Sequence, residues 1–184
     1  MWKLSLLLLL AALTYGQKQK NEMPAPPKKR LEIGRIVTER DTVGKDSFVT
    51  PEGKGLPAGR GTAFAGKQLY EKRCSRCHGS RGEGADDQAL AGGIGSLATA
   101  KELRTVGSFW PHAPGVWDYV NRSMPFNQPG ALGADQVYSV VAYILYLNKL
   151  IDEKDEMNPT TLPQVKMPNR DGFVKDSRPD VTSK

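Results

Sequence analysis

The two cysteines of the chain lie in the pentapeptide Cys74-Ser75-Arg76-Cys77-His78, and this motif constrains the fold more than any other feature. On a helix end, a spacing of three residues places both thiols on one side, where they can reach the two vinyl groups of one porphyrin. His78 would then lie under the ring and offer its Nε2 atom to iron. The motif is the pattern of c-type haem attachment. It predicts one covalently bound haem c, held by Cys74 and Cys77, with His78 as an iron ligand.

Three other kinds of site would use the same residues. A thioredoxin-like redox pair normally follows a strand in a βαβ unit, whereas the segment before Cys74 has helical periodicity. A zinc site needs four ligands, and the only obvious soft donors are Cys74, Cys77, His78 and His112. A plain disulfide would leave His78 without a role. We therefore favour haem over these three.

The second axial ligand of such a haem has to come from elsewhere in the chain. We favour Met124, because the turn Ser123-Met124-Pro125-Phe126 lies between two predicted helices and would fix the side chain. The other candidates are Met23, His112, Met157 and Met167. Ligation by His78 and Met124 would fill all six iron positions and raise the reduction potential. It would favour electron transfer over catalysis at the iron.

The N-terminus predicts export. Residues 1–16 contain one lysine, an apolar run and then small residues, which is typical of a secretory signal peptide. The apolar run of residues 4–13 would rise only ~15 Å as a helix, about half of a bilayer core. We expect a periplasmic protein without stable membrane insertion. The formal net charge of +6 does not indicate nucleic-acid binding, because an exported chain without a nucleic-acid-binding fold has no such partner.

Composition predicts a small core with long irregular extensions. After residues 1–16, the chain is poor in apolar residues and rich in proline and glycine, of which the whole chain has 13 and 19. A haem would therefore add apolar volume to a core that has too little of its own. We expect a basic, Pro/Gly-rich lead segment over residues 17–60, a cytochrome c domain over 61–150 and an extended tail over 151–184. Periodicity and capping residues predict helices from Thr62 into the cysteine pair and over 101–105, 114–123 and 134–148.

Residues 61–150 resemble class I cytochromes c. The resemblance rests on Gly66, Tyr70, the cysteine motif followed by Gly79, a glycine-rich loop, Met124-Pro125, and a last helix containing Tyr143 and Leu147. It implies an all-α fold around one covalent haem, in which the first and last helices cross at Gly66. One stretch departs from the family, which often has Pro-x-Leu where this chain has Gln88-Ala89-Leu90. The proline carbonyl of the family accepts the Nδ1 proton of the haem histidine, so this acceptor cannot be assumed for His78.

A narrower resemblance covers most of the chain. Residues 55–59, 105–111, 117–127 and 162–173 together resemble the cytochrome subunit of bacterial sulfite or sulfane dehydrogenases. The resemblance implies that a molybdenum-containing dehydrogenase subunit donates electrons to the haem, and a downstream cytochrome or oxidase receives them. One alternative is a general carrier that serves a terminal oxidase. Another is a haem enzyme acting on a sulfur substrate, but such enzymes use a free cysteine, and haem attachment would consume both cysteines here.

Overall fold

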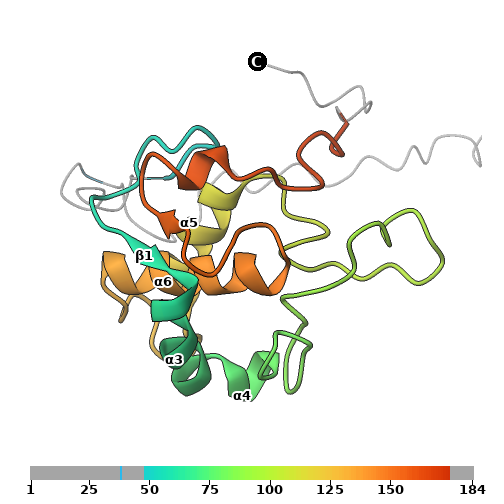
Figure 1. The fold of residues 1–184 in the computed structure, drawn as a ribbon, viewed down its shortest axis with the longest axis horizontal. Coiled ribbons are helices and arrows are strands. Elements are labelled where there is room, and N and C mark those ends of the chain that lie inside the picture. The colour runs from blue at the N-terminus through green and yellow to red at the C-terminus, as the bar shows by residue number, and fades with distance from the viewer. Residues whose placement is uncertain (1–37, 39–47, 175–184) are drawn as a thin grey trace, which may run out of the picture. The chain divides into compact units, whose positions relative to one another are not determined.

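The computed structural model describes residue 38 and residues 48–174. The chain divides into the units Met1–Val43 and Gly44–Lys184, and all described residues except Thr38 belong to the second unit. The predicted signal peptide and most of the lead segment lie outside the described residues. The second unit contains the elements β1 (Gly61–Thr62), α3 (Ala63–Arg73), α4 (Ser75–His78), α5 (Ala113–Ser123), α6 (Ala134–Leu147), β2 (Glu156–Met157) and the 3₁₀ turn η1 (Leu162–Gln164) (Figure 1). The architecture is helical, as the resemblance implies.

Helix α3 begins and ends where the sequence predicts. Thr62 has extended backbone angles, and its side chain accepts a hydrogen bond from the Ala65 N–H at 3.2 Å, which satisfies one of the free donors at a helix start. The helix ends at Cys74, whose N–H donates to the Tyr70 carbonyl at 2.8 Å. A single helix therefore leads directly into the cysteine motif.

Helices α3 and α6 cross at Gly66 (Figure 1). A Cβ atom at position 66 would overlap the backbone carbonyl of Ser139 and lie 3.1 Å from the Cβ atom of Tyr143. The rings of Tyr70 and Tyr143 pack beside this contact, with centroids 5.1 Å apart. The expected crossing of the first and last helices is confirmed, and the absence of a side chain at Gly66 is what permits the close approach.

The core is built around α6. Every residue of this helix from Val137 to Leu145 is buried, because α3, α5 and the C-terminal tail all pack against it. Trp117 of α5 packs against Tyr138, with ring centroids 5.4 Å apart. No helix among the described residues has the length and apolarity needed to cross a membrane.

Residues 48–60 of the lead segment and 151–174 of the tail belong to the same unit as the helices. Strands β1 and β2 pair antiparallel, with Gly61 opposite Met157, and the Tyr138 hydroxyl donates to the Pro57 carbonyl at 3.0 Å. In the tail, Leu162, Val165 and Met167 are buried in the core. The described part of the tail contains no α-helix, as expected, and its buried apolar residues pack in the core of its own unit.

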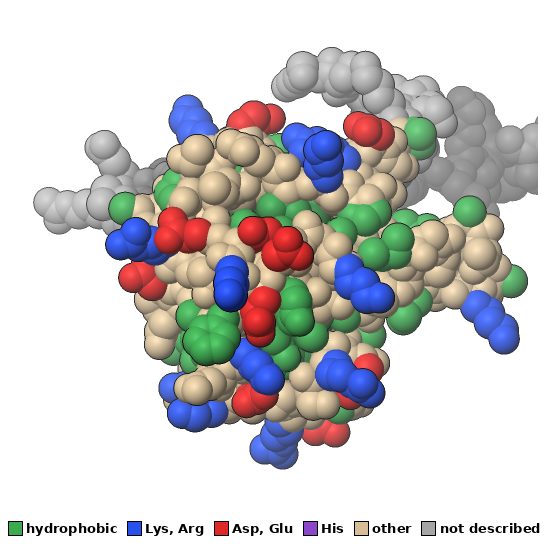
Figure 2. Space-filling view, in the orientation of Figure 1, with side chains coloured by type: hydrophobic (Ala, Val, Ile, Leu, Met, Phe, Trp, Pro, Cys, Tyr) green, Lys and Arg blue, Asp and Glu red, His purple; other side chains and the backbone are tan. Residues whose placement is uncertain are grey.

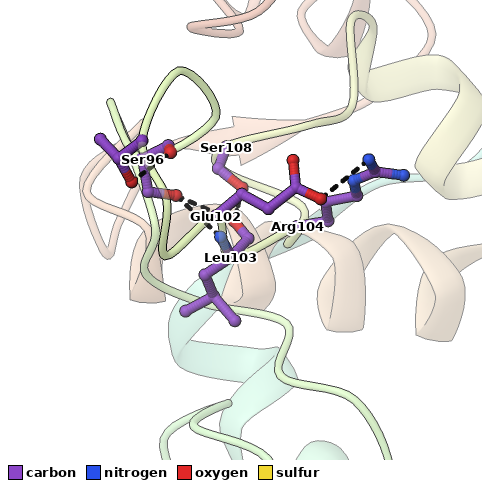
Figure 3. Close-up of polar contacts among 6 residues, drawn as sticks. Ser96, Glu102, Leu103, Arg104 and Ser108 are labelled. Atoms are coloured by element: carbon purple, nitrogen blue, oxygen red, sulfur yellow. Dashed lines mark hydrogen bonds and ion pairs between the residues drawn. The ribbon is translucent and has the colours of Figure 1, made fainter.

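The predicted short helix over 101–105 is wrong, because side chains capture the backbone of Leu103. The Ser96 hydroxyl accepts from the Leu103 N–H at 2.9 Å, and the Ser108 hydroxyl donates to the Leu103 carbonyl at 2.6 Å (Figure 3). Serine hydroxyls compete with helical hydrogen bonds in this way. An ion pair of 3.0 Å between Arg104 and Glu102 lies on the same loop.

Candidate haem site

The cysteine motif forms one turn of helix α4. Cys74 separates α3 from α4, and its carbonyl accepts from the N–H groups of Cys77 and His78 at 3.1 and 3.0 Å. Both cysteines are free, with Cys74 half-buried and Cys77 exposed. Burial, helped by the nearby Cys77, raises the pKa of the Cys74 thiol to about 11, so this thiol is protonated at neutral pH before attachment. The turn places Cys74, Cys77 and His78 within one helical turn, as a c-type site requires.

His78 is oriented by a backbone carbonyl. Its Nδ1 atom lies 2.7 Å from the carbonyl oxygen of Gln88. A carbonyl oxygen can only accept a hydrogen bond, so Nδ1 carries the proton and the lone pair is on Nε2, which is the atom free to bind a metal. Gln88 is the first residue of the stretch that replaces Pro-x-Leu. The usual position therefore still provides the acceptor, although the proline is missing.

The loop that carries Gln88 is anchored to the cysteine motif. The N–H groups of Ala85 and Asp87 donate to the Cys77 carbonyl at 3.1 and 2.8 Å, and the Gly84 N–H donates to the His78 carbonyl at 2.8 Å. These bonds keep the loop against the turn of α4. The position of the His78 acceptor is thus set by the same segment that would hold the haem.

Asn148 holds the other end of this loop, and sequence reasoning missed it. It caps α6, is only 4% exposed, and its side chain donates to the carbonyls of Leu90 and Ile144 at 3.0 and 2.9 Å. Its Oδ1 atom accepts from the Gly92 N–H at 3.1 Å. Asparagine at a helix end is a common cap, but nothing in the sequence shows that it bonds to a loop far away in the chain.

Replacing Asn148 by alanine is expected to lower the free energy of unfolding by about 2–4 kcal/mol, because it removes three hydrogen bonds and leaves the Gly92 N–H without its partner. Urea unfolding of the holoprotein measures this. Asn127→Ala is the matched control, since Asn127 is exposed and surface changes usually stay within about 0.5 kcal/mol. Equal effects of the two substitutions would contradict the role given to Asn148.

Tyr70 and Gly79 fix the end of α4. Tyr70 is fully buried, its hydroxyl donates to the Gly79 carbonyl at 2.9 Å, and burial raises its pKa well above the usual range. Gly79 has a φ of 80°, which favours glycine, and a Cβ atom there would meet the carboxylate of Glu83. The chain leaving His78 is therefore held from α3 by a neutral tyrosine.

Glu83 closes this turn with its carboxylate. Hydrogen bonds from its own N–H and from the Arg81 N–H, the latter at 2.6 Å, hold the pKa of Glu83 below its usual value of 4.5. A lowered folded-state pKa stabilises the fold above the unfolded value and loses this contribution as pH falls through the folded value. Wild type is expected to be more stable than Glu83→Gln at pH 7, with the difference shrinking below about pH 4.5. Unfolding curves at several pH values measure it, and a difference independent of pH would be the contrary result.

The candidate axial methionines occupy different environments. Met124 ends α5, its N–H donates to the Val120 carbonyl at 3.1 Å, and its side chain is half-buried at the margin of the core. Met157 and Met167 are buried within the core, 4% and 3% exposed. Met23 lies outside the described residues. Of Met124, Met157 and Met167, Met124 has the environment that suits a ligand at the edge of a cofactor.

The loop after Met124 is tied to the helix before Cys74. Arg73 donates from its Nη1 atom to the Gln128 side-chain oxygen at 2.8 Å. Arg73 precedes Cys74 directly, and Gln128 follows Met124 by four residues. The structure thus brings the segment with the proposed second ligand next to the cysteine motif.

His112 is held by a different helix from His78. It is the N-cap residue of α5, and it lies near enough to Glu52 to contribute, with Arg170, to that carboxyl's lowered pKa, behind the larger effects of hydrogen bonds from the Glu52 N–H and Thr50. This position between the lead segment and the tail favours a loop histidine over an iron ligand. Among the described residues, no cluster of three or more His, Cys, Asp or Glu side chains could hold a metal ion.

The described residues fit a haem. Cys74, Leu90, Met124 and Leu147 are half-buried apolar residues at the margin of the core, which is where a porphyrin would extend it. The buried atoms His112 Nδ1 and Trp117 Nε1 lack a hydrogen-bond partner. Buried polar groups are normally paired. The indole N–H, and a histidine Nδ1 that carries the proton, need acceptors, and the two propionates of a haem would be such acceptors.

Comparison with known proteins identifies the family. Residues 63–148 match the family model described as cytochrome c. A chain in the crystal structure of the sulfane dehydrogenase SoxCD from Paracoccus pantotrophus is 38% identical, with a TM-score of 0.72, and the match covers 81% of this chain and 74% of that one. The chain belongs to the cytochrome c family. Comparison with curated proteins gives no match.

Membership of this family establishes the cofactor and the general activity. Cytochromes c carry covalently bound haem c, and Cys74 and Cys77 fit its attachment. The general activity is electron transfer. The match to the SoxCD chain extends beyond residues 63–148, so this cytochrome c shares more with that chain than the haem domain, and it resembles the cytochromes of sulfur oxidation.

Proposed function

We propose that the protein is a periplasmic monohaem cytochrome c that takes single electrons from a molybdenum-containing sulfite or sulfane dehydrogenase subunit and passes them to a downstream cytochrome or oxidase. The observation that carries the proposal is the 38% identity to a SoxCD chain over 81% of this chain. In this role the protein is the non-catalytic partner of an oxidoreductase. Residues 1–16 act as a signal peptide in this proposal, which N-terminal sequencing of the exported protein would test.

Each proposed site residue has one task. Cys74 and Cys77 would anchor the cofactor, while His78 Nε2 and the Met124 sulfur would bind its iron. When bound, the haem supplies a one-electron couple between ferric and ferrous iron. The Gln88 carbonyl keeps the proton of His78 on Nδ1. With both ligands supplied by the chain, the iron would have no site for oxygen or peroxide, which favours electron transfer over haem catalysis.

The surface near Met124 supports docking by apolar contact. Phe126 follows Met124 by two residues and is 86% exposed. The face shown in Figure 2 carries basic and acidic side chains interspersed, with hydrophobic side chains between them. Mixed charges give weaker long-range steering than a patch of one sign, so this face is not expected to steer a partner strongly.

The proposal is tested by reconstitution. The purified cytochrome is mixed with sulfite or a sulfane-sulfur substrate, with and without the molybdenum subunit, and haem reduction is followed by absorbance. Reduction only when the molybdenum subunit is present supports the proposal. Substrate-dependent reduction by the cytochrome alone would instead indicate a sulfur-processing haem enzyme. No reduction in either mixture would favour a general carrier to an oxidase.

A matched pair of variants locates the docking surface. Phe126→Ala is expected to slow reduction by the molybdenum subunit about tenfold without changing the reduction potential, as for an exposed aromatic anchor worth about 1.4 kcal/mol. Phe64→Ala is the control, because Phe64 is 72% exposed at the start of α3, away from the cysteine motif in sequence. Equal rates for the two variants would contradict docking at the Met124 loop.

A further inference from the structure

The acceptor of the His78 proton is itself held by a side chain. The Oδ1 atom of Asp87 accepts a hydrogen bond from the Gln88 N–H at 2.7 Å. The N–H of Asp87 donates to the Cys77 carbonyl at 2.8 Å, and the Gln88 carbonyl accepts from His78 Nδ1 at 2.7 Å. These three bonds form a continuous path from Cys77 through Asp87 and Gln88 back to His78.

We propose that Asp87 is a positioning residue that tunes the reduction potential by holding the Gln88 carbonyl against His78. The inference rests on His78 being the iron ligand, and it goes beyond the proposed function by assigning a residue that does not touch the cofactor. A carboxylate that binds its neighbour's N–H fixes the chain locally. With its N–H engaged by Asp87, Gln88 keeps its carbonyl aimed at the histidine.

The hydrogen bond on Nδ1 affects the metal through the ring. A strong acceptor at Nδ1 makes the histidine a better electron donor at Nε2. A better donor stabilises ferric iron more than ferrous iron, since ferric iron carries the higher charge. Weakening the bond therefore raises the reduction potential, which shifts the equilibrium toward the ferrous form.

Charge and hydrogen bonding at position 87 can be separated. Asp87→Asn removes the negative charge but keeps a side-chain oxygen that can accept from the Gln88 N–H, whereas Asp87→Ala removes both. Asp86→Asn removes a charge from the neighbouring residue, which is exposed and lies 3.9 Å from Arg76. The difference between Asp87→Ala and Asp87→Asn thus isolates the hydrogen bond.

Redox titration of the wild-type, Asp87→Ala, Asp87→Asn and Asp86→Asn holoproteins tests the proposal. Asp87→Ala is expected to shift the ferric-to-ferrous equilibrium at least threefold further toward ferrous than Asp87→Asn, where a tenfold shift equals 59 mV. Asp87→Asn and Asp86→Asn should differ little from each other. In the ferrous protein, the His78 Nδ1–H signal in NMR should exchange faster with water in Asp87→Ala than in Asp87→Asn. Equal potentials and equal exchange rates for the two Asp87 variants would overturn the proposal.

Gln88→Pro gives a second test, of whether Asp87 acts through the Gln88 N–H. Proline has no N–H, so in Gln88→Pro the Asp87 side chain has no hydrogen-bond donor at position 88. Gln88→Pro with Asp87→Ala should then have the same potential as Gln88→Pro with Asp87→Asn, and a difference of threefold or more in the equilibrium between these two double variants would overturn the proposal. Loss of reduction by the molybdenum subunit, in contrast, bears only on the proposed function.

Discussion

Replacing Met124 by alanine is expected to abolish the near-infrared band that methionine ligation gives to ferric haem. The reduction potential should fall by on the order of 0.1 V, because thioether sulfur favours ferrous iron and axial ligands set haem potentials over roughly 0.8 V. Met124 is half-buried at the end of α5, so its removal should affect the iron more than the core. Absorption spectra and redox titration of the holoprotein measure both effects.

Met167→Ala is the matched control for this substitution. Met167 is 3% exposed within the core, so its truncation should cost about 2–5 kcal/mol of unfolding free energy and leave the near-infrared band in place. Met157→Ala should behave like Met167→Ala. Retention of the band in Met124→Ala, or its loss in either control, would show that Met124 is not the ligand.

Replacing Gly66 by alanine is expected to destabilise the protein by about 3 kcal/mol or more, the upper end of what overpacking costs. The added methyl group would overlap the Ser139 carbonyl. Each of these groups is fixed to a helix backbone, so neither can move without moving its helix. Helices α3 and α6 would have to move apart, which also separates the packed rings of Tyr70 and Tyr143. Thermal and urea unfolding of the holoprotein measure the loss.

Gly115→Ala separates the effect of crowding from that of helix propensity. Gly115 also lies in a helix, but a Cβ atom there would meet only the Trp110 ring, 3.6 Å away. This substitution should stabilise the protein by up to about 1 kcal/mol, the propensity difference between glycine and alanine. A neutral or stabilising effect of Gly66→Ala would refute the close crossing.

Local signals in the sequence predicted the elements that frame the site. Thr62 as a cap, the turn that contains Cys74 and Cys77, and the last helix up to Asn148 all depend on residues close together in the chain, and the structure shows each of them. The family resemblance implied that the first and last helices cross at Gly66. A glycine within a helix also indicates a close contact there, because only such a contact would justify its cost in stability.

The loop before α5 could not be predicted in the same way. Its shape depends on serine hydroxyls and on Asn148, whose partners Leu90 and Gly92 lie far away in sequence. The Gln88 carbonyl is a different case. A backbone acceptor does not depend on the side chain of its residue, so the loss of proline at this position did not remove the bond to His78.

The central claim is that one haem is bound covalently through Cys74 and Cys77, and it is tested most directly by mass spectrometry of the denatured exported protein alongside a haem-stained denaturing gel. The account predicts a chain whose mass is increased by one haem, with a stained band that disappears when both cysteines are replaced by alanine. A colourless product with the mass of the polypeptide alone would contradict it.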